Sequence, residues 1–211
     1  MTGKRTAGDA MVEQYIIDEG KQLALIAMGA NLPSAAGPAA TTIEIAVAQL
    51  RQELDVLAVS EFYRTPAFAP ATGPDYVNAA LAARWSGTPR ELMALLHRHE
   101  DILGRDREGV ARWAPRLVDL DLLALGDLVL PDGPTHDALR ARDRMDRLIP
   151  GAADPIVPHP GLQERAFVLR PLADVAPQWR HPRLGRTVQQ MLADLPRDEQ
   201  DGIHLLARRT I

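Results

Sequence analysis

Six segments of two kinds follow one another along the first 125 residues of the chain, and their order constrains the fold more than any other feature of the sequence. Short apolar or alternating runs, bounded by turn-forming residues, predict strands at 23–28, 55–63, 76–85 and 118–125. Apolar residues at helical spacing predict helices at 38–54 and 88–102, the second of which begins with a capping box at Thr88 and Glu91. The predicted order is therefore β-α-β-β-α-β.

This order is that of the ferredoxin-like arrangement, in which two βαβ units share one antiparallel sheet and both helices cover one face. We therefore expect an α+β fold built on such a sheet. An apolar segment at 167–172 and a short helix capped by Thr187 follow further along the chain. We expect these C-terminal elements to cover the second face of the sheet, which would give three layers, α/β/α.

The length of 211 residues suits one hydrophobic core and is too short for two fused enzymes. We expect a flexible N-terminal arm at 1–20 and a single domain at 21–211. The segment at about 131–155 begins and ends with proline and glycine and mixes charges of both signs. We expect it to be a solvated surface excursion that contains at most one helix.

The composition excludes several classes of protein. With 46% hydrophobic and 25% charged residues the chain is globular, and without cysteine it has no disulfide, thiolate metal site or cysteine nucleophile. No apolar run approaches the roughly 20 residues of a membrane helix, so we expect a cytoplasmic protein with no membrane partner. The net charge of −4 disfavours nucleic acid as a partner.

Two carboxylates stand at the start of the last predicted strand. Asp119 and Asp121 are separated by one residue, so both side chains project from the same face of the strand. Mg²⁺ prefers a few carboxylates together with phosphate oxygens and water, which makes this pair suitable for a metal–nucleotide site. Taken alone, the pair is explained as well by an exposed acidic strand end.

Arginines precede this pair at Arg105, Arg107, Arg112 and Arg116. Guanidinium groups match the geometry of phosphate and neutralise the charge that develops during phosphoryl transfer. A solvated loop balanced by neighbouring acidic residues explains the same arginines without a function. Their position next to two carboxylates favours a phosphate site.

Four further side chains could bind a flat heterocycle or a phosphate. Trp113 lies within the polar arginine-rich loop, and Tyr76 and Asn78 share one face of the third predicted strand. An aromatic surface beside an amide is suited to stack on a fused ring and read its edge, although core packing is the alternative for each residue. His159 stands between two prolines, which makes its backbone rigid, but a single histidine is more often structural.

Together these residues resemble the 6-hydroxymethyl-7,8-dihydropterin pyrophosphokinase family of folate biosynthesis. The family signature is matched throughout 112–123, which reads RWAPRLVDLDLL. Blocks similar to the family, in the family's order, also stand at 29–32, 62–66, 74–79 and 158–160, and the similarity extends from about Leu23 to Leu195.

The resemblance implies transfer of pyrophosphate from ATP to the hydroxymethyl oxygen of the pterin, with AMP as the other product. It implies that Asp119 and Asp121 bind two Mg²⁺ ions and that Arg105 and Arg116 stabilise the transferred group. It also implies contacts to the nucleotide from Glu100, Arg107, His159 and Arg165, and contacts to the pterin from Thr65, Pro66, Phe68, Tyr76, Asn78, Trp113 and Phe167. We expect a monomer that takes these two small-molecule substrates.

Two alternatives belong to other classes. The sequence departs from the family pattern at Ala30, His97, Glu108, Asp154 and Ile156, which is compatible with a relative that binds a pterin or a nucleotide without catalysis. RNA-recognition domains have the same order of elements, but the acidic charge, the 4% aromatic content and the lack of a basic-aromatic strand motif disfavour an RNA-binding module.

Overall fold

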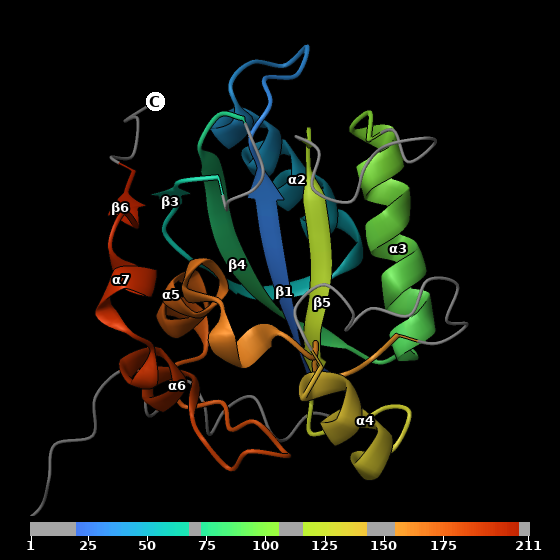
Figure 1. Cartoon of the computed structure of the whole chain (residues 1–211). Helices are drawn as coiled ribbons and strands as arrows, with labels where there is room; N and C mark the ends of the chain where they lie inside the picture. Colours follow the sequence, from blue (N-terminus) through green and yellow to red (C-terminus); the bar gives the residue numbers. More distant parts are fainter. Residues whose placement is uncertain (1–19, 68–72, 106–115, 143–154, 207–211) are drawn as a thin grey trace, which may run out of the picture.

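The computed structural model describes residues 20–67, 73–105, 116–142 and 155–206. Within these residues, six strands form one antiparallel sheet, shown in Figure 1. The strands are β1 (Gln22–Ala30), β2 (Asp55–Val59), β3 (Tyr63–Thr65), β4 (Tyr76–Trp85), β5 (Asp119–Leu125) and β6 (His204–Leu205). The pairing β5-β1-β4-β2 is the strand order of a ferredoxin-like sheet, so the predicted α+β fold is confirmed.

The predicted strand at 55–63 is wrong in one respect, because the chain forms two strands there. The break follows Val59, where Ser60 donates its own N–H to the carbonyl of Ala80 and accepts the N–H of Ala80 with its side-chain hydroxyl. The hydroxyl thus takes the place of a backbone acceptor, and the regular ladder ends. β2 and β3 consequently pair with different parts of β4.

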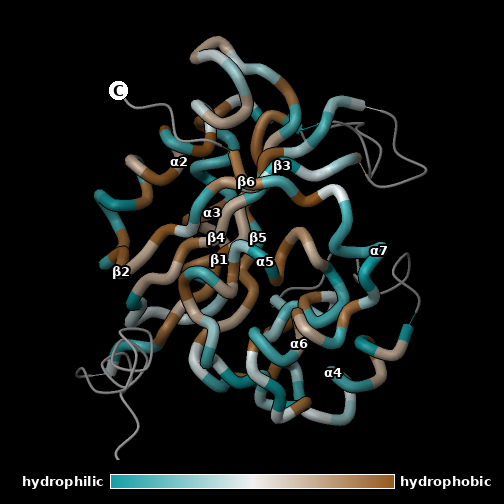
Figure 2. Tube along the Cα trace, turned by 90° about the vertical axis from the view of Figure 1, so that its left-hand side faces the viewer, coloured by the Kyte–Doolittle hydropathy of each residue, from teal (hydrophilic) through white to brown (hydrophobic). Residues whose placement is uncertain are grey.

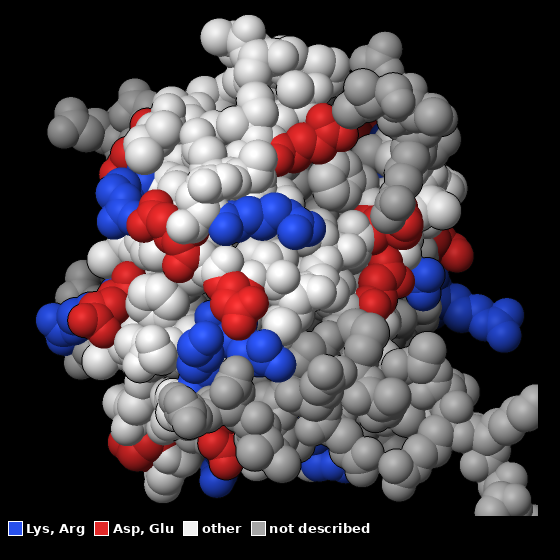
Figure 3. Space-filling view, turned by 180° about the vertical axis from the view of Figure 1, so that it is seen from behind, with Lys and Arg blue, Asp and Glu red and all other residues white. Residues whose placement is uncertain are grey.

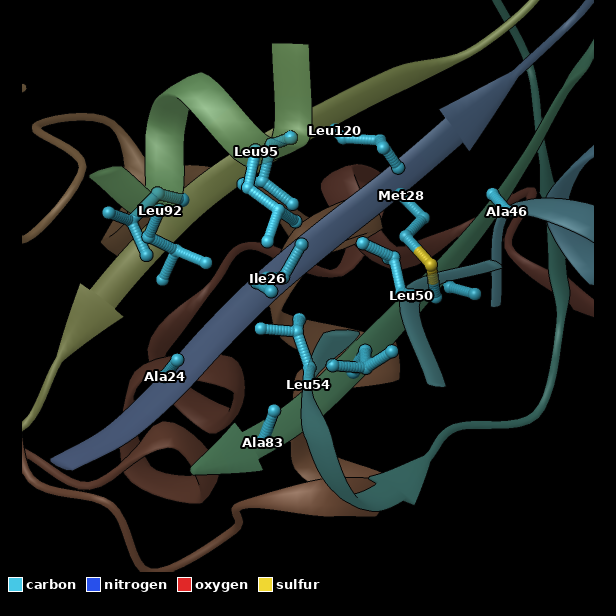
Figure 4. Packing of buried hydrophobic residues seen from close by; sticks show 14 of the residues in the cluster. Ala24, Ile26, Met28, Ala46, Leu50, Leu54, Ala83, Leu92, Leu95 and Leu120 are labelled. Atoms are coloured by element: carbon cyan, nitrogen blue, oxygen red, sulfur yellow. The ribbon is translucent and has the colours of Figure 1, made fainter. Parts of the chain in front are cut away.

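Helices α2 (Ala39–Glu53) and α3 (Pro89–Ile102) cover one face of the sheet. Ile26 and Met28 project from β1 toward Leu50 of α2 and Leu92 and Leu95 of α3, as Figure 4 shows. The predicted capping box of α3 is confirmed, with the Thr88 hydroxyl accepting the Glu91 N–H and the Glu91 carboxylate accepting the Thr88 N–H. Both predicted helices are thus present and hold the larger core.

The second face is covered by α5 (Ala166–Val175) and α6 (Val188–Asp194), with the 3-10 turn η1 (Leu162–Glu164) before them. A second core forms there around Leu25, Ala82 and Leu123 of the sheet and Leu169 and Leu172 of α5. In Figure 2 the hydrophobic residues accordingly gather about the strands between the two helix layers. The predicted three layers are confirmed, whereas α7 (Arg197–Gln200) and β6 were not expected from the sequence.

The predicted surface excursion contains the helix α4 (Gly133–Arg140), capped by the side chain of Asp132. This helix is docked rather than solvated, because His136 and Leu139 are buried on its inner side. Asp137 on its outer side pairs with Arg183. The rest of the excursion, 143–154, and residues 1–19 of the predicted arm lie outside the described residues.

Two features of the described residues bear on membrane spans and on surface charge. Among the described helices, none combines the length and apolar character needed to cross a bilayer. Figure 3 shows the molecule from behind relative to Figure 1, and on this side acidic and basic side chains are interspersed.

We predict that Leu96→Ala lowers the free energy of unfolding by about 2–5 kcal/mol, because Leu96 of α3 is fully buried and its truncation leaves a cavity in the core. Urea denaturation followed by circular dichroism measures the change. Ile102→Ala in the same helix is the matched control, since Ile102 is 61% exposed and should cost less than about 0.5 kcal/mol. Equal effects of the two substitutions would contradict the described packing.

A pH-dependent contribution to stability comes from His181, which is buried beside α4. Its Nδ1 accepts the N–H groups of Arg183 (3.1 Å) and Leu184 (3.3 Å), so the neutral ring carries its proton on Nε2. Burial, together with the charges of His136 and Arg140, lowers the pKa of His181 to about 4. The folded protein therefore holds this ring neutral at pH values where an exposed histidine is protonated.

We predict that stability falls as the pH drops from about 6.5 to 4, by up to roughly 3 kcal/mol from His181 alone. In this window the unfolded chain binds a proton at His181 that the folded chain does not, so acid favours unfolding. Urea denaturation at pH 7 and pH 4.5 measures the loss. His181→Phe should flatten this dependence, and an unchanged slope in that variant would contradict the assignment.

Candidate active site

Four strands carry one row of paired residues across the sheet. Asp119 of β5 pairs with Gly29 of β1, Gly29 pairs with Asn78 of β4, and Asn78 pairs with Tyr63 of β3. Directly paired residues of antiparallel strands point to the same face, so we call this set the Asp119–Tyr63 row. The row lies on the face that bears α5, because the Tyr63 hydroxyl donates to Asp174 of that helix (2.8 Å). Asp121 faces the same side, as predicted.

Gly29 keeps the middle of this row free of side-chain atoms. A Cβ atom at Gly29 would lie 3.2 Å from Oδ1 of Asn78, closer than an ordinary contact. The absence of a side chain therefore leaves the space between Asp119 and Asn78 open. From the sequence, Gly29 was a turn former within the family-like block at 29–32 and was not predicted as a site residue, because its neighbours in the row come from distant parts of the chain.

The amide of Asn78 has one defined orientation. Its Nδ2 donates to the Thr65 hydroxyl (2.8 Å), and both residues are buried. The Asn78 Oδ1, which is a hydrogen-bond acceptor, therefore points toward the Gly29 side of the row. Thr65 pairs in turn with Tyr76, so three of the predicted pterin residues lie together.

Tyr76 connects this amide region to the charged residues. Burial raises the pKa of the Tyr76 phenol, and the charges of Arg116 and Asp119 act on it in opposite directions. These effects require all three side chains to be near one another. Residues predicted for the pterin and residues predicted for phosphate are therefore neighbours.

Asp119 is held by two guanidinium groups. Its Oδ1 accepts from Nη1 of Arg105 and its Oδ2 accepts from Nη1 of Arg116, each at 2.5 Å. Arg105 also pairs with Glu100 of α3, whose Oε1 accepts the N–H of Leu120 (2.7 Å). Although burial disfavours its charge, Asp119 and Glu100 raise the pKa of Arg105. Glu100 is thus placed where it ties helix α3 to strand β5 and orients Arg105.

Asp121 disfavours the charged form of Asp119. Burial and the charge of Asp121 raise the pKa of Asp119, against the opposite effect of Arg116 and Arg105. Within the part of the chain that the structure describes, the side chain of Asp121 makes no hydrogen bond or ion pair. One carboxylate of the pair is therefore available to a cation.

Asn31, which follows β1, fixes the position of Arg116. Its Oδ1 accepts the Arg116 N–H (2.7 Å), and its own N–H donates to the Arg116 carbonyl (3.1 Å). Its Nδ2 donates to the carbonyl of Pro74, just before β4. Asn31 was not predicted as a site residue, although the sequence placed it among turn formers after the first strand and within the family-like block at 29–32.

His159 is attached to the strand of the two aspartates. Its N–H donates to the carbonyl of Leu123 in β5 (2.7 Å), and its Nδ1 accepts the N–H of Gly161 (3.1 Å). The proton of the neutral ring is consequently on Nε2. Arg165 occupies the N-cap position of α5, and its guanidinium carbon lies 6.0 Å from the ring centre of Phe167.

The other predicted site residues are placed as follows. Pro66 comes directly after β3, where a Cβ atom on Gly202 would approach it to 3.1 Å. Phe68, Arg107 and Trp113 lie outside the described residues. The structure thus brings the predicted catalytic residues together, with Glu100 bonded to them and Asn78, Thr65 and Tyr76 beside them.

A sequence model for 7,8-dihydro-6-hydroxymethylpterin-pyrophosphokinase (HPPK) matches residues 25–177. The chain belongs to the HPPK family. Curated relatives named 2-amino-4-hydroxy-6-hydroxymethyldihydropteridine pyrophosphokinase include one from Synechocystis, 35% identical over 171 residues, which are 80% of this chain and 74% of the relative. Another, from Pseudomonas aeruginosa, is 36% identical over 68% of this chain and 75% of the relative.

Solved structures of HPPK-containing proteins share the fold of this chain. The wild-type HPPK-DHPS of Plasmodium falciparum superposes with a TM-score of 0.59 at 12% identity and covers 82% of this chain. This chain spans only 44% of the Plasmodium chain. At this identity the likeness shows the fold alone.

The HPPK signature at 112–123 is the part of the sequence that ends in the two aspartates. Its described residues supply Arg116, Asp119 and Asp121 to the site. No group of three or more histidine, aspartate or glutamate side chains suited to a metal is found among the described residues. A metal in this HPPK would therefore need ligands beyond the two aspartates, such as phosphate oxygens and water.

We predict that Glu100→Gln lowers the free energy of unfolding by about 3 kcal/mol, because it removes one charge of a buried ion pair and leaves Arg105 partly uncompensated. Urea denaturation at neutral pH measures the change. Asp55→Asn is the control, since Asp55 is 45% exposed in its pair with Arg84 and should cost about 1 kcal/mol or less. An effect of Glu100→Gln no larger than the control would show that this ion pair does not hold α3 to β5.

Proposed function

We propose that this chain transfers pyrophosphate from ATP to the hydroxymethyl oxygen of 6-hydroxymethyl-7,8-dihydropterin and releases AMP, the reaction that the family resemblance implies. One observation carries the proposal: Asp119, bound to two guanidinium groups, shares a sheet face with Asn78 across the open position of Gly29. A charged end suited to phosphates therefore adjoins a neutral end suited to a heterocycle.

The neutral end would bind the pterin. Asn78 presents its Oδ1 as an acceptor for an N–H at the edge of the ring, because its Nδ2 is already bonded to Thr65. We assign Tyr76 and Phe167 to flank the ring, in agreement with the preference of flat heterocycles for aromatic faces. Thr65, Pro66, Phe68 and Trp113 complete the proposed pterin site.

The charged end would bind the triphosphate. Glu100 and Asp119 hold the guanidinium group of Arg105. Asn31 bonds the backbone of Arg116, and Asp119 accepts from its guanidinium group, so both cations are oriented before substrate arrives. The neutral His159 ring carries its proton on Nε2, because its Nδ1 accepts the N–H of Gly161. We assign Glu100, Arg107, His159 and Arg165 to the nucleotide, where Glu100 acts by holding Arg105.

Asp119 and Asp121 are the proposed Mg²⁺ ligands. The donor set fits the ion, because Mg²⁺ prefers carboxylate oxygens and the two side chains lie on one face of β5. The charge of Asp121 raises the pKa of Asp119, so a divalent cation near both carboxylates would offset this repulsion. When bound, Mg²⁺ would supply charge neutralisation for the phosphates and for the oxygens that gain charge.

The reaction needs no nucleophilic side chain. The hydroxymethyl oxygen attacks the β-phosphorus of ATP, the bond from that phosphorus to the α-phosphate oxygen breaks, and the hydroxyl proton passes to solvent. AMP leaves with the electron pair of the broken bond. The chain contributes by holding the two substrates in line and by opposing the negative charge with Arg105 and Arg116.

A non-catalytic relative is the second candidate, suggested by departures from the family pattern. Two of them lie away from the Asp119–Tyr63 row: Ala30 is buried in the core on the opposite face, and His97 is exposed on α3. Because these two departures lie away from the row, they favour a catalytic protein over one that only binds its ligands. We further propose that the chain acts as a monomer in the cytoplasm, where ATP is available.

We predict that the protein, mixed with Mg-ATP and 6-hydroxymethyl-7,8-dihydropterin, forms AMP and the pterin diphosphate in equal amounts. Chromatography of the nucleotides measures the product. ADP would identify an ordinary kinase, and thermal stabilisation by the substrates without AMP would identify a non-catalytic binder.

Replacing Asp121 by Ala should lower kcat by at least about 10³-fold and leave the fold intact, because Asp121 has no described structural bond. AMP formation and the circular dichroism spectrum are the two measurements. Asp127→Ala is the control, since Asp127 is exposed in the turn after β5, and it should keep normal activity. A near-normal rate in the Asp121 variant would remove this residue from the mechanism.

A further inference from the structure

Helix α4 of the excursion contacts the segment that carries His159. His136 of this helix is 0% exposed, and its Nε2 lies 2.7 Å from the carbonyl oxygen of Pro158. A carbonyl oxygen only accepts hydrogen bonds, so the ring carries a proton on Nε2 and donates it. The excursion is thereby bonded to the residue immediately before His159.

This bond and a second one act on the same peptide group. The carbonyl of Pro158 and the N–H of His159 belong to one planar unit, and the N–H donates to Leu123 of β5 (2.7 Å). Fixing both ends of a planar unit sets its orientation, and with it the direction in which the His159 side chain leaves the backbone. β5 holds one end of this peptide and α4 holds the other.

Packing alone does not explain a histidine at this place. The Nδ1 of His136 and the Nε2 of His181 are buried and have no hydrogen-bond partner among the described residues. An unpaired buried polar atom costs free energy that an apolar side chain would avoid. The favourable contact that His136 makes in return is its bond to Pro158.

We propose that His136 is a positioning residue for His159: its Nε2–H holds the Pro158–His159 peptide so that the His159 ring presents its own Nε2–H to a phosphate of the nucleotide. This inference rests on the proposed function, because it takes the nucleotide to be the partner of His159. Loss of the bond should weaken ATP binding and leave pterin binding unchanged.

His181 provides a matched control within the same buried cluster. Its ring centre lies 6.0 Å from that of His136, and it is equally buried. Its Nδ1, however, bonds the backbone of Arg183 and Leu184 and not the segment 157–160. Substitution of His181 therefore disturbs the packing around α4 without removing the bond to Pro158.

The experiment compares His136→Phe, His136→Gln and His181→Phe in the full chain by AMP formation. For His136→Phe we expect the KM for ATP to rise about 10-fold, with the KM for the pterin and kcat changed less than about 3-fold. His136→Gln, which keeps an N–H donor, should recover most of the ATP affinity. His181→Phe should change the KM for ATP less than about 2-fold. Equal increases for both Phe variants, or no increase for His136→Phe, would overturn the proposal.

Amide hydrogen exchange of the free protein separates this proposal from the proposed function. His136→Phe should speed exchange of the His159 and Gly161 amides about 10-fold, and His181→Phe should not. A wild-type protein that forms no AMP refutes the proposed function, whereas unchanged exchange in His136→Phe refutes the contact between α4 and His159.

One measurement needs no substitution and so does not depend on the folding of a variant. The ¹⁵N shifts of the His136 ring in the wild-type protein should identify the neutral tautomer protonated on Nε2. A neutral ring protonated on Nδ1, which leaves no proton on Nε2, would overturn the proposal.

Discussion

The antiparallel register of β5, β1 and β4 is the constraint on which the rest of the structure depends. It sets Asp119, Gly29 and Asn78 side by side on one face, and it sends the intervening Met28 and Leu120 into the core under α2 and α3. A slip of one residue would exchange the two faces, burying the carboxylate and exposing the apolar side chains. The core residues therefore determine the register, and the register assembles the site. For this reason the proposed pterin and phosphate ends lie together without a loop to join them.

Charge balance explains why so many ionised groups coexist at the end of β5. Asp119 accepts hydrogen bonds from the guanidinium groups of Arg105 and Arg116, and Arg105 also forms an ion pair with the buried Glu100. Each buried charge thus has a partner, without which burial would be costly. Asp121 is the exception among the described residues, and its charge raises the pKa of Asp119. A divalent cation carrying a triphosphate would relieve this repulsion and supply new partners for the arginines.

The features that could be predicted from the sequence are those that depend on residues close together in the chain. The capping box at Thr88 and the alternation of Asp119 and Asp121 involve residues close in sequence, and both were predicted. The split of the second strand depends on the Ser60 hydroxyl meeting Ala80, and the importance of Gly29 depends on Asn78 facing it from another strand. Such contacts arise only from tertiary pairing. The docking of α4 was missed for the same reason, since the polar composition around it suggested solvent exposure.

Strand β5 sets the spacing of the residues that we propose for the phosphates. It carries Asp119 and Asp121 on one face, and the carbonyl of Leu123 further along holds the N–H of His159. The spacing between the carboxylates and the His159 backbone is therefore set by a strand whose residues 122–125 are buried and have little freedom to move. The orientation of the His159 peptide is less constrained by that one bond, because rotation about it is possible. The bond from His136 to the carbonyl of Pro158 prevents this rotation. Helix α4, which lies outside the sheet, therefore influences the direction of the His159 side chain.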